Sequence, residues 1–188
     1  YYVTDIAAGQ DSSIWLATNK GLMHFASGTW SVWNTENSAI ATDYLTEVDS
    51  EPAGVWVRSG FGVQHFNGEV FDQTFDATNS PIRPALISGM DVAPNGTLFV
   101  AMTSGVVAGL PDCWSCKGGL IEYSNGVFTR YDDTNSGLSI PNLTTVWCAG
   151  NGHVYCASVD GTLFDLFNGT WSAHFRGNYK FPSTFVTR

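Results

Sequence analysis

The chain repeats one pattern four times, and this repeat constrains the fold more than any other feature of its 188 residues. The segment Ser13–Phe25 aligns with Gly54–Phe66 without a gap, and each contains a Trp, a Gly turn and a closing aromatic residue. A third copy starts at Gly96 and resumes at Gly119, and a fourth starts at Gly152. Repeats of about 40 residues are typical of solenoids, propellers and other arrays. Recurring positions are therefore mostly structural, and functional residues are expected where the copies differ.

The spacing of the aromatic residues locates one insertion. The aromatic residues early in each copy are Trp15, Trp56, Phe99 and Tyr155, in steps of 41, 43 and 56 residues. The aromatic residues that we align at the end of each third segment are Phe25, Phe66, Tyr123 and Phe167, in steps of 41, 57 and 44 residues. The third copy therefore carries an insertion between Ala101 and Gly119, expected at residues 102–118.

Each copy has the pattern of four short strands joined by turns. In the first copy we expect strands at Thr4–Ala8, Ile14–Thr18, Leu22–Phe25 and Trp30–Trp33. β-Branched and aromatic runs bounded by Gly, Asn, Asp and Ser are the signals for strands and turns, and no amphipathic stretch is long enough for a helix. Four strands in about 40 residues match one propeller blade. The predicted fold class is thus an all-β propeller with four blades of four antiparallel strands.

The order hydrophobic-Trp-hydrophobic-small-Thr/Ser, turn, Gly-Leu, two residues, aromatic, Gly turn, aromatic resembles the two-component-regulator-type propeller repeat. The resemblance covers the whole chain apart from the insertion. In that family the turn before the Trp usually has the sequence Asp-x-x-Gly, whereas this chain has degenerate versions such as Asp11-Ser12-Ser13. The resemblance implies the propeller fold. It does not imply one function, because such repeats occur in sensor ectodomains, secreted proteins and propeller enzymes.

We expect residues 1–188 to form a single propeller domain, with blades at roughly 3–45, 46–87, 88–143 and 144–187 and the insertion in the third blade. Phe185–Thr187 aligns with Tyr2–Thr4, where a fifth copy would begin. Three arrangements stay open: a closed ring of four blades, a segment of a larger propeller or array, and head-to-tail association of neighbouring molecules. We favour closure, because an open ring leaves a sheet edge and a blade face uncovered.

Composition narrows the class of partner. The chain is 44% hydrophobic and 14% aromatic, which is enough to bury a sizeable core. Eight basic and seventeen acidic residues give a net charge of −9. We therefore expect no nucleic-acid partner, since binding a polyanion needs basic residues. No apolar run is long enough to span a membrane, and the absence of a signal peptide with a first residue other than Met indicates a processed or shortened chain.

Four cysteines and three sequons bear on the compartment. Cys148 and Cys156 flank a turn on adjacent strands and are expected to face the same side of the sheet, which would suit a cross-strand disulfide. Cys113 and Cys116 lie in the insertion and would close a small disulfide ring; a redox motif and a four-cysteine zinc site are the alternatives.

Glycosylation is expected at three Asn-x-Thr sequons, at Asn95, Asn142 and Asn168, although a turn-rich sequence also produces such triplets by chance. Together with the cysteines and the low Lys content, the sequons predict a secreted or cell-surface protein.

Candidates for catalysis are few. His24 and His65 occupy equivalent repeat positions, each before an aromatic residue, so we interpret them as part of the repeat. The pattern brings no Ser, His and Asp together, and no nucleophile-elbow motif is present. Asp91, Asp132 and Asp160 fit turns better than a glycosidase pair. Calcium would suit the acidic loops, but no EF-hand spacing supports it. We expect no catalytic residue, metal or cofactor.

The insertion, Met102–Gly118, departs most from the repeat. Trp114 lies within it and is expected to be exposed, where it would stack on a sugar or contact a protein; folding back as a cap over the blade edge is the alternative. The favoured function is a non-catalytic extracellular structural or interaction module that binds a protein or glycan partner or copies of itself, assembling head-to-tail into a filament. The alternatives are a carbohydrate-binding or ligand-binding sensor ectodomain and a polysaccharide hydrolase or lyase.

Overall fold

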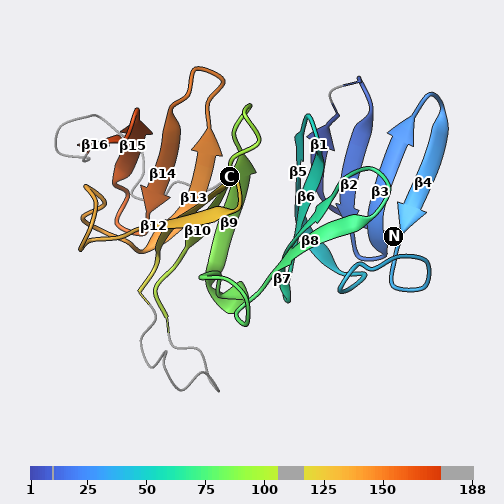
Figure 1. The fold of residues 1–188 in the computed structure, drawn as a ribbon, viewed down its shortest axis with the longest axis horizontal. Helices are drawn as coiled ribbons and strands as arrows, with labels where there is room; N and C mark the ends of the chain where they lie inside the picture. Colours follow the sequence, from blue (N-terminus) through green and yellow to red (C-terminus); the bar gives the residue numbers. More distant parts are fainter. Residues whose placement is uncertain (10, 106–116, 175–188) are drawn as a thin grey trace. The chain divides into compact units, whose positions relative to one another are not determined.

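The structure, a computed structural model, describes residues 1–9, 11–105 and 117–174, and these fold almost entirely as antiparallel β-sheet (Figure 1). Within these ranges sixteen strands form four sheets of four strands each, and one short 3-10 helix, η1 (Pro84–Leu86), precedes the third sheet. The fold is a β-propeller fold with one blade per repeat, so the predicted fold class is confirmed.

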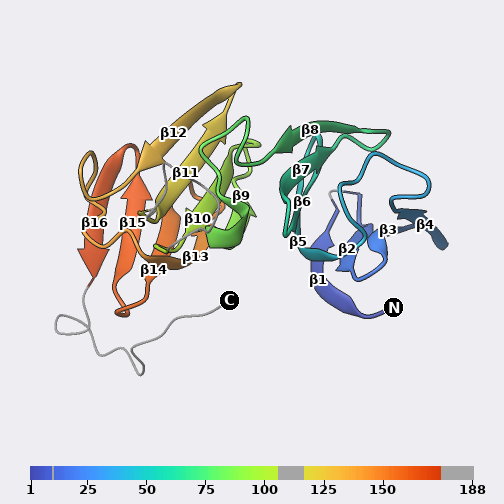
Figure 2. The same cartoon turned by 90° about the horizontal axis from the view of Figure 1, so that it is seen from below.

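Every blade is a simple meander, because strands that follow each other in the sequence are neighbours in the sheet (Figure 2). The first blade contains β1 (Val3–Ala8), β2 (Ile14–Thr18), β3 (Gly21–Ala26) and β4 (Thr29–Trp33). The second contains β5 (Leu45–Glu51), β6 (Gly54–Ser59), β7 (Gly62–Phe66) and β8 (Phe71–Phe75). The third contains β9 (Ile87–Val92), β10 (Leu98–Met102), β11 (Gly119–Ser124) and β12 (Val127–Tyr131). The fourth contains β13 (Leu143–Cys148), β14 (Val154–Ser158), β15 (Leu163–Phe167) and β16 (Thr170–His174).

The predicted strands of the first copy are confirmed to within one residue at each end. One alignment in the fourth copy was wrong. Ala157 pairs with Leu163 as Ala17 pairs with Leu22, so five residues separate the fourth-copy pair and four separate the first-copy pair. The longer turn moves the register by one residue. Leu166, not Phe167, is therefore the equivalent of Phe25.

The chain divides into two compact units, Tyr1–Pro84 with the first two blades and Ala85–Arg188 with the last two. In the first unit, Trp15 and Ala17 share one buried cluster with Val48 and Phe66 of the next blade. Trp15 meets Phe66 edge-on, with 6.0 Å between ring centroids. Each unit therefore has a core between the facing sheets of its two blades.

The second unit repeats this arrangement with different side chains. Phe99 and Leu120 of the third blade share a buried cluster with Val146, Val154 and Phe164 of the fourth. Removing such apolar surface from water stabilises by roughly 25 cal/mol per Å². Successive side chains of a strand point to opposite faces of the sheet, so every second residue points toward the neighbouring blade. The repeat therefore determines which two sheet faces pack against each other.

A polar connector follows the outer strand of the first three blades, and its hydrogen bonds are the same each time. In the connector Asp76–Ser80, Asn79 Oδ1 accepts from the Asp76 N–H at 3.0 Å, and Asn79 Nδ2 donates to the Thr74 carbonyl at 2.8 Å. Ser80 Oγ donates to the Asp76 carbonyl at 2.6 Å and accepts from the Ile82 N–H at 3.2 Å. All four bonds recur in the connectors 34–38 and 132–136.

The connector turns the chain so that an aliphatic side chain enters the interior two residues later. Ile40, Ile82 and Leu138 follow the three connector serines and are 4%, 0% and 0% exposed. Ile40 joins the core of the first unit and Leu138 that of the second. Where the chain leaves the sheet, its backbone groups no longer form hydrogen bonds between strands. Hydrogen bonds from nearby side chains satisfy these backbone groups instead.

The Gly that opens the third strand is required by sterics. Gly21, Gly62 and Gly119 have φ of +105°, +135° and +141°. A Cβ atom at Gly21 would lie 2.1 Å from the Trp33 carbonyl oxygen, and one at Gly62 would lie 2.1 Å from that of Phe75. Only glycine accepts both the dihedral angle and the close approach, which explains the Gly-Leu of the repeat.

We expect Asn37→Ala to lower the free energy of unfolding by about 1–2 kcal/mol, because it removes two connector hydrogen bonds, each with a modest net contribution. Glu36→Ala, one residue away, is the matched control and should change stability by less than about 0.5 kcal/mol. Urea unfolding followed by tryptophan fluorescence measures both. Equal stabilities for the two variants would contradict a structural role for the connector.

Candidate functional site

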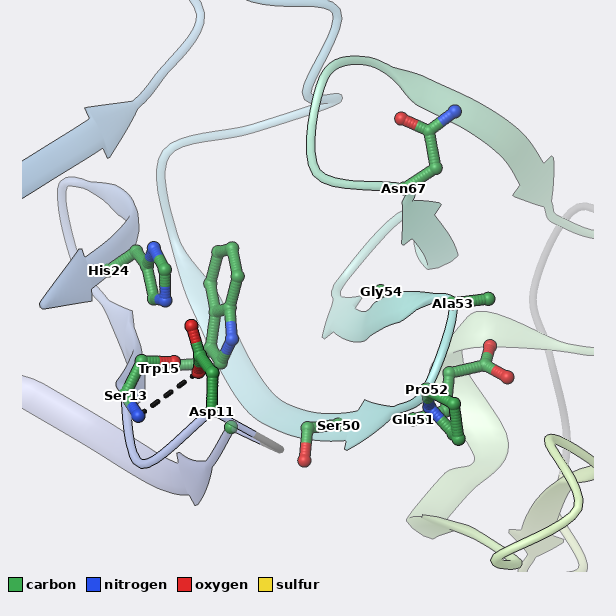
Figure 3. A pocket seen from close by; sticks show the side chains of 11 residues that line it. Asp11, Ser13, Trp15, His24, Ser50, Glu51, Pro52, Ala53, Gly54 and Asn67 are labelled. Atoms are coloured by element: carbon green, nitrogen blue, oxygen red, sulfur yellow. Dashed lines mark hydrogen bonds between the residues drawn. The ribbon is translucent and has the colours of Figure 1, made fainter. Parts of the chain in front are cut away.

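A cleft of about 290 Å³ lies between the first and second blades, at the end where β1 turns into β2 (Figure 3). We call it the Asp11 cleft. Its walls come from that turn, from β2 and β3, and from the turn between β5 and β6, and none of its residues is Lys or Arg. It is lined by Gly9, Asp11, Ser13, Trp15, His24, Ser50, Glu51, Pro52, Ala53, Gly54 and Asn67.

The turn between β1 and β2 gathers polar atoms at one point of the cleft. Asp11 Oδ1 accepts from the Ser13 N–H at 3.1 Å, and the Gly9 N–H donates to the Ser13 carbonyl at 2.9 Å. A Cβ atom at Gly9 would lie 2.1 Å from Ser13 Oγ, 3.0 Å from Asp11 Oδ1 and 3.3 Å from Trp15 Nε1. The absence of a side chain at Gly9 therefore makes room for these three groups to converge.

His24 reaches the same cleft from β3 because it lies directly opposite Trp15 in the β2–β3 ladder. The two rings stack with centroids 3.8 Å apart and planes 14° apart, and Figure 3 shows them side by side with Asp11 next to the indole. Aromatic packing of this kind fixes the orientation of the imidazole. The expected equivalence of His24 and His65 is confirmed by the register, since His65 pairs with Trp56 in the same way.

Two buried polar atoms of the Asp11 cleft lack a hydrogen-bond partner. Ser13 is 4% exposed, and its hydroxyl lies beside the Asp11 carboxylate without a hydrogen bond of normal geometry. His24 Nε2 is buried and has no partner either. A buried polar group left unsatisfied costs about 1–3 kcal/mol. Native proteins keep few such groups, so each one requires an explanation.

The charges in the cleft follow from these surroundings. Burial lowers the pKa of His24, and the neighbouring Asp11 carboxylate only partly offsets this effect, so the imidazole is neutral at neutral pH. Ser13, through its hydroxyl and its N–H, lowers the pKa of Asp11, so this carboxyl is ionised. Within the described part of the chain Asp11 has no Lys or Arg partner. The cleft thus has one negative charge that no basic side chain neutralises.

The residue opposite the second-strand aromatic is polar in every copy, and in the other three copies it lies beside a polar or charged partner. His65 Nδ1 lies 2.7 Å from Asp72 Oδ1, and its Nε2 lies 3.2 Å from Glu51 Oε1. Glu122 accepts from the Tyr131 hydroxyl at 2.7 Å, and Asp165 lies 2.8 Å from His153 Nδ1. Burial and the Glu122 carboxylate raise the pKa of Tyr131 to about 12.

A cleft of about 250 Å³ in the second unit is the positional equivalent of the Asp11 cleft, and its polar groups are paired. Thr97, the equivalent of Ser13, is 5% exposed, but its hydroxyl donates to Ser124 Oγ at 3.3 Å. Asn95 takes the place of Asp11, since its Oδ1 accepts from the Thr97 N–H at 3.1 Å. The two clefts have the same construction, but among the described residues only the first is lined by buried polar atoms without a hydrogen-bond partner.

Asp11, Ser13 and His24 line one cleft, although the repeat pattern alone indicated no Ser, His and Asp together. The signal was available in the strand register, which places His24 opposite Trp15 and both near the preceding turn. No hydrogen bond joins Ser13 Oγ to His24 Nε2. The three residues therefore do not form the bonded nucleophile and base that acyl transfer uses.

The acidic residues considered for catalysis hold backbone groups instead. Asp91 Oδ2 accepts from the Cys148 N–H at 2.7 Å and so joins the third blade to the fourth. Asp132 belongs to its connector, and Asp160 accepts from the Thr162 N–H at 3.1 Å in a turn. Among the described residues no group of three or more His, Cys, Asp or Glu side chains is placed to hold a metal ion.

The expected disulfide between Cys148 and Cys156 does not form in the structure. Cys148 pairs with Val154 and Cys156 pairs with Val146, so the two cysteines are offset by two positions in the ladder. Such diagonal neighbours have Cα atoms about 7–8 Å apart, which is beyond the usual span of a disulfide. Cys156 instead lies in the core, where burial raises its pKa.

The other predicted sites divide by position. Asn95 and Asn168 are exposed in turns, so a glycan at either would extend into solvent. Asn142 is only partly exposed, and its Oδ1 accepts from the Ser104 N–H at 2.9 Å and from the Thr103 hydroxyl. Glycosylation at all three stays a prediction. The predicted contact residue Trp114 and the predicted disulfide pair Cys113 and Cys116 lie outside the described residues.

A second candidate surface is a face of the fourth blade that the described residues of its own unit leave exposed, with a hollow of about 420 Å³. Trp147 is 55% exposed there and stacks on Tyr155 with centroids 5.8 Å apart. By register these residues are the equivalents of Ala7 and Trp15, which the second blade covers in the first unit. We call this surface the Trp147 face; it consists of Thr145, Trp147, Tyr155, Ala157 and Leu163.

The first blade has the complementary face, which the described residues of its own unit leave exposed. Ile6 and Ile14 are 61% and 37% exposed, although their equivalents Val48 and Val55 are 2% and 0% exposed in the core of the first unit. We call this surface the Ile6 face; it consists of Ile6, Ile14, Leu16 and Phe25.

Comparison with known proteins supports the fold. No protein-family model matches the sequence, and no curated protein matches it. The extracellular domain of the hybrid two component system BT3049 from B. thetaiotaomicron has a TM-score of 0.63 at 19% identity, covering 93% of this chain and 24% of that chain. The extracellular domain of BT4673 from the same organism has a TM-score of 0.60 at 14% identity, covering 92% and 22%.

Virginiamycin B lyase from Staphylococcus aureus is similar too, with a TM-score of 0.63 at 9% identity over 91% of this chain and 54% of that chain. The chain spans about a quarter of the length of the two extracellular domains. At these identities the likeness shows the propeller fold alone. No helix among the described residues is long and apolar enough to cross a bilayer.

The two equivalent histidines should affect stability with opposite pH dependence. Burial alone would lower the pKa of His65, but the carboxylates of Glu51 and Asp72 outweigh it and the pKa is raised. The ion pairs of His65 therefore stabilise the fold below about pH 6.5 and lose this effect as pH rises through the folded-state pKa. Urea midpoints between pH 5 and 9 should fall less steeply for His65→Gln than for the wild type.

His24→Gln is the matched control, because the lowered pKa of His24 affects stability in the opposite direction, with loss on the acid side. It should leave the decline at higher pH intact. If both variants kept the wild-type decline, the paired His65 would not be its source.

Proposed function

We propose that this protein is a non-catalytic extracellular interaction module, and that it associates head-to-tail through its two bare blade faces. The observation that supports this function is the exposure of the Trp147 face. Trp147 is 55% exposed, whereas Ala7, its equivalent in a covered blade, is 8% exposed. Large exposed apolar patches on soluble proteins mark interaction sites.

The covering partner of this face can be read from the chain itself. In the first unit the equivalent face is covered by Val48, Val55 and Phe66. In the second unit it is covered by Val146 and Val154. The surface that covers the Trp147 face is therefore expected to be a blade face with aliphatic side chains and one larger apolar residue. The Ile6 face has this composition, so the chain has both halves of one blade interface.

Ring closure within one chain would pair the same two faces; we propose that they pair with a second copy instead, and self-association distinguishes the two arrangements. The Trp147 face of one molecule would cover the Ile6 face of the next, in a heterologous contact that can continue. Such a contact links identical subunits into a linear assembly unless it closes on itself.

A non-catalytic function fits the described polar clusters better than the hydrolase or lyase alternative. A glycosidase needs two carboxyl groups that face each other across a substrate. Asp91, Asp132 and Asp160 each bind backbone N–H groups of their own turns or neighbouring strands. The sensor-ectodomain alternative is favoured by one observation, the Asp11 cleft.

We expect Trp147→Arg to weaken self-association by roughly thirtyfold or more in Kd, because a buried Trp at an interface contributes about 2 kcal/mol or more. Ile6→Arg should do the same from the other side. Sedimentation velocity over a concentration series measures the assembly of each variant. Phe61→Arg is the control, since Phe61 is 64% exposed but lies on neither face.

A mixture of the two variants gives the sharper test. Each variant retains one intact face, so the mixture should form dimers but nothing longer. Wild-type protein that sediments as a monomer at every concentration, or association that Trp147→Arg leaves unchanged, would refute the head-to-tail assembly.

A further inference from the structure

We propose that the Asp11 cleft is a binding site for a primary ammonium group, with Asp11, Ser13 and His24 as its three acceptors. This site is distinct from the two blade faces, and it does not depend on the assembly proposed above. It extends the sensor-ectodomain alternative by naming the chemical group that the cleft would bind.

Charge is the first argument. Asp11 is an ionised carboxylate in a cleft whose lining includes no Lys or Arg. The other carboxylate in the lining, Glu51, already accepts from Trp56 Nε1 at 2.8 Å and lies 3.2 Å from His65 Nε2. Asp11 is thus the free charge, and it favours a cationic ligand over an anionic one.

The unpaired atoms are the second argument. An ammonium group has three donors and no acceptor. Ser13 Oγ is free to accept, and so is His24 Nε2 when the proton of the neutral imidazole is on Nδ1. Together with Asp11 they supply three acceptors among the residues that line the cleft. A bound ammonium group would satisfy both buried atoms that the protein leaves unpaired.

A hydroxyl group is the competing ligand chemistry, since it would also use the Trp15 indole N–H as a donor. Hydrogen bonds to an ionised partner are roughly twice as strong as those between neutral groups. Asp11 would form such a bond with either ligand, but only an ammonium group also neutralises its charge. The cleft, at about 290 Å³, admits one functional group on a short chain rather than an oligosaccharide.

The second unit shows that the turn at the position of Asp11 also forms with an amide side chain. Its equivalent cleft has Asn95 in place of Asp11, and its Thr97 hydroxyl is bonded to Ser124. The fourth copy also uses an amide, since Asn151 Oδ1 accepts from the His153 N–H at 3.3 Å. Asn therefore performs the turn function of this position without charge. Asp11→Asn should keep the fold of the turn and remove only the charge.

Titration of the full chain tests the proposal, by calorimetry and by the Trp15 indole N–H resonance in 1H–15N NMR. The probes are Nα-acetyl-lysine methylamide and its uncharged analogue Nα-acetyl-norleucine methylamide, with glucosamine and glucose as a second pair. We expect saturable binding of at least one amine, and no binding of its uncharged partner. Asp11→Asn should weaken binding by about tenfold or more, because it removes a charge-assisted hydrogen bond.

Glu36→Gln is the matched control, since it removes one negative charge from the same unit outside the cleft and should leave the affinity unchanged. Ser13→Ala should weaken binding several-fold, because it removes one of the three acceptors. If only the lysine derivative binds, the natural ligand is expected to be a peptide side chain. If only glucosamine binds, it is expected to be a free amine. Either result supports the ammonium site. Equal binding of glucosamine and glucose, no binding of any probe, or equal loss in Glu36→Gln would overturn it.

Discussion

The packing of one blade face on the next is the interaction on which the rest of this structure depends. A single four-stranded sheet cannot bury its apolar residues by itself, and the hydrogen-bonded connector is what directs each new blade onto the previous one. Ile40 and Leu138 show how the two are coupled. Each follows a connector serine, and each is buried in the core that the connector helps to close.

This dependence explains why the sequence predicted the fold well. Residues that meet in an inter-blade core have to recur in every copy, and so do the glycine at the start of the third strand and the Asn and Ser of the connector. Recurrence makes them visible without a structure. The strand limits of the first copy and the place of the insertion followed from it. The one misaligned aromatic, Phe167, came from a turn with one extra residue, which changes register without changing composition.

The candidate site could not be predicted in the same way, because it consists of what the repeat does not determine. His24 and His65 look alike in the sequence, but their surroundings differ. The carboxylates of Glu51 and Asp72 lie beside the ring nitrogens of His65, whereas the buried Nε2 of His24 has no hydrogen-bond partner. Those partners come from other strands, so only the three-dimensional register shows them. Cys148 and Cys156 illustrate the reverse error: proximity in sequence suggested a bond that a two-position offset in the ladder prevents.

Four copies of one structural position thus act as a comparison within a single molecule. Opposite the second-strand aromatic, Glu122 is bound by Tyr131, Asp165 by His153 and His65 by two carboxylates. Stability alone would favour a satisfied group at each copy, since an unpaired buried atom is a net cost. His65 Nε2 also lacks a hydrogen bond, but a carboxylate lies beside each nitrogen of its ring. His24 Nε2 has no hydrogen-bond partner and lines the same cleft as Asp11, a carboxylate without a basic partner among the described residues. In a repeat array the departure from the satisfied pattern is where a ligand can contribute the missing partner.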